Sequence, residues 1–234
     1  MRHQASRREF VTLATIAGLS LFGPKFAWTA NPESTVSADE ALKMLMEGND
    51  RFAKGHPTGP RRTPDDFKAL AAGQHPKAAI LTCADSRVAP EVLFDVGLGD
   101  IFVVRVAGNV VTGAGPMVNG SIEYAVAELK VPLIVVLGHS ACGAVKAAVE
   151  TLHEKDALPG SINGMVELVK PAVVASQGMP GDALDNAISK NVELGVTALQ
   201  TSDPIVAPLV RDGKIKVVGG VYDLASGTVN WQKK

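Results

Sequence analysis

Cysteine is scarce in this chain, and so are aromatic residues and any excess of charge. Two cysteines occur among 234 residues, aromatic residues make up 5% of the chain, and the formal net charge is −1. The basic residues form no runs, so the electrostatic footprint of a nucleic-acid-binding protein is missing. No C-x-x-C motif is present, which argues against a dithiol redox site. Without internal repeats or low-complexity tracts, the composition is typical of one globular domain.

The amino-terminal segment differs from the rest of the chain. Ser6-Arg7-Arg8-Glu9-Phe10 leads into a short apolar run that ends at Phe22, shorter than the roughly 20 residues that a membrane-spanning helix needs. A charged start before such a run is typical of an export signal, and the arginine pair resembles the twin-arginine signal of bacteria. We therefore expect residues 1–30 to engage the twin-arginine export machinery and residues 31–234 to form one domain in the periplasm, or otherwise outside a bacterial cytoplasm.

Two alternatives for this segment stay open. The segment could instead be a frayed amphipathic helix, and the poor match of Trp28 to a cleavage site before residue 31 leaves an uncleaved anchor open. Export would place both cysteines in an oxidising compartment, where a pair usually forms a disulfide.

From Pro76 onward, apolar runs alternate with amphipathic segments, the pattern of an α/β fold with a parallel sheet and helical crossovers. Strands are predicted at residues 77–82, 100–106, 133–137 and 215–221, with an edge strand at 227–231. Helices are predicted at residues 38–53, 65–72, 90–94, 119–129, 144–152, 165–174, 183–200 and 205–210. The first helix begins with a capping box, Ser37 to Glu40, and its apolar face could pack on a partner subunit.

Each cysteine lies near the end of an apolar run. Cys83-Ala84-Asp85-Ser86-Arg87 follows the run at 78–82, and Gly138-His139-Ser140-Ala141-Cys142-Gly143 follows the run at 131–137. The carboxyl ends of parallel strands are where open α/β sheets place their ligands. We therefore expect the two segments to meet at one site.

The side chains of these segments suit a zinc site. Cys83, His139 and Cys142 offer two thiolates and one imidazole, and three protein ligands leave the open fourth position of a catalytic zinc. Asp85 could fill that position or accept a proton from water bound there, and Arg87 could hold Asp85 off the metal in a bidentate pair. A disulfide, unrelated buried thiols, and a plain surface ion pair are the alternatives.

Three motifs, C-A-D-S-R-V, G-S-I-E-Y-A-V and V-L-G-H-S-A-C-G-A-V, closely resemble those of the β-class carbonic anhydrases, and the resemblance extends from about Ala38 to Trp231. It implies four parallel strands plus an antiparallel edge strand, flanked by helices. It also implies an N-terminal helical arm that clasps a second subunit, in a homodimer or a dimer-based homotetramer.

The resemblance also implies the chemistry. Cys83, His139 and Cys142 match the ligands of one Zn²⁺ per subunit, and Asp85 and Arg87 match a catalytic dyad. The substrate site would include Gln74, Phe102, Tyr124 and Gly143, partly from the neighbouring subunit. The expected reaction is the reversible hydration of carbon dioxide to bicarbonate and a proton, by attack of zinc-bound hydroxide. Carbonyl sulfide or carbon disulfide as substrate, and a non-catalytic zinc or redox module, are the competing hypotheses.

Overall fold

A five-stranded sheet forms the centre of the protein, in the order β2-β1-β3-β4-β5. The computed structural model describes residues 36–153 and 158–233, so the predicted export signal at 1–30 lies outside the described residues. Neighbours among the first four strands pair in parallel, and β5 pairs antiparallel to β4. The strands are β1 (Ala78–Thr82), β2 (Ile101–Arg105), β3 (Leu133–His139), β4 (Lys216–Tyr222) and β5 (Val229–Trp231). The predicted mostly parallel sheet with an antiparallel edge strand is confirmed.

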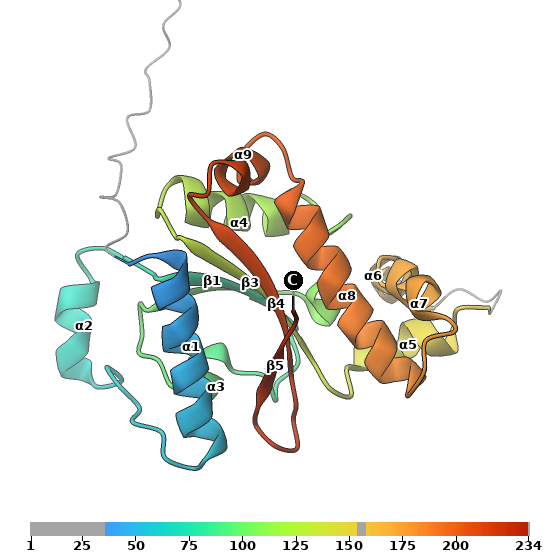
Figure 1. Ribbon diagram of the computed structural model, residues 1–234, viewed down its shortest axis with the longest axis horizontal. Helices are drawn as coiled ribbons and strands as arrows, with labels where there is room; N and C mark the ends of the chain where they lie inside the picture. The colour runs from blue at the N-terminus through green and yellow to red at the C-terminus, as the bar shows by residue number, and fades with distance from the viewer. Residues whose placement is uncertain (1–35, 154–157, 234) are drawn as a thin grey trace, which may run out of the picture.

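Helices cover both faces of this sheet (Figure 1). One face packs against α4 (Pro116–Ala127), α8 (Ala183–Gln200) and α9 (Val206–Arg211). The other face packs against α1 (Ala38–Ala53) and α3 (Pro90–Leu93). Alternation along the strands explains both layers, because Ala79 and Leu81 belong to the first cluster whereas Ala78 and Ile80 belong to the second. A short helix, α2 (Pro64–Leu70), follows α1.

A third cluster lies beyond the carboxyl ends of the strands, where α5 (Gly143–Glu150), α6 (Ser161–Glu167) and α7 (Lys170–Ser176) pack around both cysteines. The single helix predicted at 165–174 is wrong, because two helices occupy this region. Pro171 has no backbone N–H to donate and is accommodated in the first turn of α7. Helix α4 likewise begins earlier than predicted, at Pro116, where Gly115 is the N-cap.

The apolar side of α1 packs on its own domain. Leu45 and Gly48 are buried there, and a Cβ at Gly48 would collide with the carbonyl of Phe94. Asn49 donates to the carbonyls of Leu93 and Gly227, at 3.0 and 2.8 Å. The predicted capping box at Ser37 is present. Contact of this helix with a second subunit stays a prediction.

None of the helices in the described part of the chain combines the length and apolar character needed to cross a membrane.

Candidate metal centre and active site

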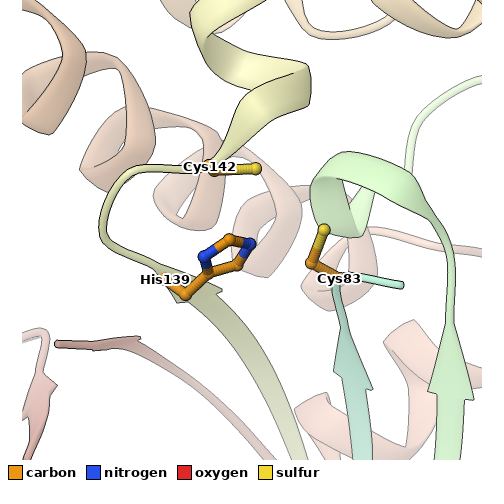
Figure 2. Close-up of side chains that lie close together, drawn as sticks. All are labelled: Cys83, His139 and Cys142. Atoms are coloured by element: carbon orange, nitrogen blue, oxygen red, sulfur yellow. The ribbon is translucent and has the colours of Figure 1, made fainter. Parts of the chain in front are cut away.

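The two chemistry-bearing segments leave adjacent strands. β1 and β3 are parallel neighbours, with Thr82 in register with Leu137, and the Thr82 hydroxyl donates to the Leu137 carbonyl at 2.9 Å. Cys83 follows β1 directly, and His139 is the last residue of β3. Cys142 is the N-cap of α5, so its side chain returns toward the strand ends. The three side chains accordingly face one another (Figure 2).

Cys83, His139 and Cys142 are buried, and their ligand atoms lie within 4.8 Å of one another. Among the described residues they are the one such group of three or more His, Cys, Asp or Glu residues. Both cysteines are free, so the disulfide alternative is not what the structure adopts.

His139 is arranged as a ligand would be. Its ring is fully buried, and Nδ1 lies 2.9 Å from the Ser140 carbonyl, which can only accept a hydrogen bond. Nδ1 is therefore the donor in this contact, and in the neutral imidazole the ring's lone pair is then on Nε2. No hydrogen-bond partner reaches Nε2. A buried nitrogen without a partner costs free energy unless something binds it.

The two thiols also suit a cation. The pKa of Cys83 lies well below its usual value, chiefly because the Cys142 thiol donates to its sulfur and also because the Gly108 backbone N–H does so at 3.3 Å. The pKa of Cys142 is raised, first by its hydrogen bond to Cys83 and then by burial. Two adjacent buried thiolates repel each other, and a divalent cation between them removes that cost. Two sulfurs and one imidazole nitrogen are the ligand types that Zn²⁺ prefers.

Asp85 and Arg87 stand beside this ligand set as a hydrogen-bonded pair. Arg87 Nε donates to Oδ1 of Asp85 at 2.9 Å and Nη2 donates to Oδ2 at 2.7 Å. These hydrogen bonds are the main reason that the pKa of Asp85 is depressed, so the carboxylate is ionised at neutral pH. Asp85 Oδ2 lies 3.8 Å from His139 Nε2. Arg87 also reaches the Ala141 carbonyl at 3.4 Å, and so joins the two segments.

Arg105 is a contributor that the sequence did not single out. Its Nε donates to the Cys83 carbonyl at 3.0 Å and its Nη2 to the Asp85 carbonyl at 2.5 Å. It can do so because it ends β2 directly opposite Thr82. The role of Arg105 could be predicted only once the register between β1 and β2 is known.

Of the remaining predicted substrate residues, Gly143 lies beside the Cys-His-Cys group of the same chain, and Gln74, Phe102 and Tyr124 do not. Gln74 is exposed and precedes the amino end of β1, whereas Cys83 follows its carboxyl end. The five residues of β1, a length of about 16 Å, lie between them. Phe102 and Tyr124 lie 6.2 Å apart between ring centroids, in a hollow of about 280 Å³ on β2 and α4. Gly143 is exposed at the start of α5, next to Cys142.

Fold and site thus define an α/β protein with a buried Cys-His-Cys group and an Asp-Arg pair at the carboxyl ends of its parallel strands. Residues 78–229 match the family profile described as carbonic anhydrase. The chain is 44% identical over 187 residues to carbonic anhydrase 2 of Mycobacterium tuberculosis, covering 80% of this chain and 89% of the relative.

Solved structures agree with this match. A Coccomyxa β-carbonic anhydrase in complex with acetazolamide superimposes with a TM-score of 0.65 at 32% identity, covering 86% of this chain and 88% of that one. One of two tetrameric β-carbonic anhydrases of Sordaria macrospora superimposes with a TM-score of 0.66 at 25% identity, covering 83% and 98%. The chain belongs to the carbonic anhydrase family of enzymes, in its β-class.

Proposed function

We propose that this enzyme catalyses the reversible hydration of carbon dioxide to bicarbonate and a proton, with one Zn²⁺ per subunit held by Cys83, His139 and Cys142. The observation that carries the proposal is the set of three buried ligand atoms within 4.8 Å of one another, one of which, His139 Nε2, has no hydrogen-bond partner. When bound, Zn²⁺ supplies a Lewis acid that makes water a nucleophile near neutral pH.

In this proposal Asp85 and Arg87 prepare the site for that water. Arg87 engages both carboxylate oxygens of Asp85, which keeps the carboxylate from acting as a fourth ligand. Oδ1 of Asp85 already accepts two hydrogen bonds from Arg87, whereas Oδ2 accepts one. Oδ2 therefore retains acceptor capacity and can accept a hydrogen bond from the reacting water and orient it. Carbon dioxide is small and apolar, so its binding contributes little free energy. Activation of water therefore has to supply most of the rate enhancement. The proton released afterwards passes to solvent, with Asp85 assisting.

A second copy of the chain completes the site in this proposal. Gln74 and Phe102 lie toward the amino ends of β1 and β2, far from Cys83 of their own chain. Met117 lines the same hollow as Phe102 and Tyr124, and its apolar side chain is 81% exposed to solvent in the single chain. The tetrameric Sordaria macrospora relatives support assembly. We infer a homodimer, or a homotetramer built from it, in which one subunit lends Gln74, Phe102 and Tyr124 to the other, while Gly143 faces substrate from the subunit that holds the metal.

We also propose that the enzyme is exported from a bacterial cytoplasm, either to the periplasm or otherwise out of the cell's cytoplasm. The support is the Ser6-Arg7-Arg8 start followed by a short apolar run. Replacing Arg7 and Arg8 together by lysine tests this by cell fractionation. The substituted protein is expected to stay in the cytoplasm, and unchanged export would refute a twin-arginine route.

Stopped-flow measurement of carbon dioxide hydration, combined with zinc analysis, tests the proposed activity. The wild-type protein should carry one zinc per chain and hydrate carbon dioxide, and the Cys142→Ala and His139→Ala variants should have neither property. Met179→Ala, which shortens an exposed side chain away from the ligand set, serves as the matched control and should behave as wild type. A metal-free wild-type protein with a Cys83–Cys142 disulfide would contradict the proposal.

A further inference from the structure

The backbone N–H of Gly108 is aimed at one of the sulfurs of the Cys-His-Cys group. Its nitrogen lies 3.3 Å from Cys83 Sγ, and the hydrogen bond is buried. Gly108 has a φ of +73° in the short 3₁₀ turn η1 (Ala107–Asn109) that follows β2. A side chain at this position would also approach Val169 and Ala144 to 3.2 and 3.3 Å. The turn therefore needs glycine, and its position decides whether the N–H reaches the sulfur.

One side chain fixes that turn from across the domain. Asn191 of α8 is buried, and its Nδ2 donates to the Gly108 carbonyl at 2.8 Å. Helix α8 lies along the sheet beside β3 and β4 (Figure 1). It is closely seated there, because a Cβ at Gly138 of β3 would meet Val192 at 2.6 Å. A helix seated in this way gives Asn191 a fixed platform.

We propose that Asn191 is a positioning residue for the metal ligand Cys83, acting through Gly108. By holding the Gly108 carbonyl, Asn191 sets the conformation of the turn, and the turn presents the Gly108 N–H to Cys83 Sγ. A hydrogen bond to a thiolate stabilises its negative charge and orients its lone pairs, which affects how firmly the sulfur holds a metal. The inference rests on the metal site proposed above.

A merely structural role for Asn191 would lower stability without touching the metal. Asn49 provides the matched control, since it is also a buried asparagine whose amide donates to backbone carbonyls, those of Leu93 and Gly227. Asn191→Asp and Asn49→Asp remove the same kind of hydrogen bond at two places. Asn191→Leu is a second variant that keeps the branched shape of the side chain, removes its hydrogen bonds and introduces no charge.

The measurements are the zinc dissociation constant, by competition with a chelator, and the near-ultraviolet thiolate-to-metal charge-transfer bands of the Co²⁺-loaded protein. Both Asn191 variants are expected to bind zinc about 10-fold more weakly and to show shifted cobalt bands, whereas Asn49→Asp should match wild type in both. Wild-type affinity and bands in the Asn191 variants would overturn the inference, and so would an equal loss in Asn49→Asp.

The wild-type protein loaded with ¹¹³Cd²⁺ keeps the inference testable if the Asn191 variants do not fold, because Asn191 is proposed to act through the hydrogen bond from Gly108 to Cys83. A scalar coupling between the metal and the Gly108 amide proton supports that step, and its absence refutes the inference. A wild-type chain that binds no metal would overturn both this inference and the proposed function. Tight binding by wild type and by the Asn191 variants alike would overturn this inference alone.

Discussion

Arg87 holds Asp85 by side-chain hydrogen bonds to both carboxylate oxygens, with Nε 2.9 Å from Oδ1 and Nη2 2.7 Å from Oδ2. The backbone N–H of Arg87 donates a third hydrogen bond to this carboxylate, to Oδ1 at 2.9 Å. A carboxylate gripped in this way keeps a single orientation. Its distance from the ligand set is therefore fixed by Arg87, and the catalytic role proposed for Asp85 depends on that orientation.

Asp85→Ala is expected to retain zinc but to lower the rate of carbon dioxide hydration at least about 100-fold, because the group that orients the water is removed. Zinc analysis and stopped-flow kinetics on the same preparation check both parts. Asp50→Ala is the control, since Asp50 also pairs with a basic side chain, Lys54 at 2.8 Å, but is exposed on α1. Full activity of Asp85→Ala would sink the assigned role.

Met117→Glu is expected to weaken assembly of the subunits. A carboxylate in place of an apolar side chain that is 81% exposed costs nothing in the single chain, but it would have to lose its water at an interface. We expect a smaller oligomer in light scattering and lower activity, since Phe102 and Tyr124 would no longer reach the neighbouring site. Ile162→Glu, at a residue of α6 that is 51% exposed, makes the same change away from this hollow. An unchanged oligomer in Met117→Glu would place the interface elsewhere.

The meeting of Cys83, His139 and Cys142 could be predicted from the sequence because each of them lies at or just after the end of an apolar run. Parallel strands bring their carboxyl ends together, so Cys83 and His139 had to meet once both runs were strands. The Asp85–Arg87 pair could be predicted because its two residues are only two positions apart in the chain.

The supporting residues could not be predicted in this way. Arg105 contacts the Cys83 segment because of the register between β1 and β2, and Asn191 reaches Gly108 across 83 residues because of how α8 packs. Neither contact produces a pattern in the sequence around the residues that make it, so the sequence alone could not predict it. Gly48 and Asn49 look like weak points of a helix in sequence, whereas the structure shows them as the points where α1 is fitted to the domain.

Asp95 gives a prediction for the dependence of stability on pH. It is buried and accepts hydrogen bonds from the Thr58 and Gly59 N–H groups and from Arg51. Burial alone would raise the pKa of Asp95, but these hydrogen bonds outweigh it, so the pKa is lowered. A lowered folded-state pKa means that the stabilisation is complete above the unfolded-state pKa of about 3.9 and is lost as the pH falls further.

Asp95→Asn is therefore expected to lower the free energy of unfolding by about 2 kcal/mol at neutral pH. The difference from wild type should stay constant between about pH 5 and 8 and shrink below about pH 4. Urea denaturation at a series of pH values measures it. Asp50→Asn, exposed on α1, should show almost no difference at any pH. A gap between wild type and Asp95→Asn that widens in acid would contradict the network.

Gly48→Ala tests whether α1 lies on its own domain in solution. On helix propensity alone this change should stabilise α1 by about 1 kcal/mol. In the structure the new Cβ would collide with the Phe94 carbonyl, which is backbone and cannot rotate away. Overpacking of this kind costs about 1–3 kcal/mol, so the two effects have opposite signs.

We expect Gly48→Ala to be destabilised in urea denaturation, with a lower denaturation midpoint than wild type. Glu47→Ala changes the exposed neighbour on the same helix, paired only loosely with Lys43 at 3.8 Å, and should be close to neutral. A stabilised Gly48→Ala protein would mean that α1 does not rest on Phe94 in solution. The apolar face around Leu45 would then be free to cover a second subunit, as expected of the N-terminal arm.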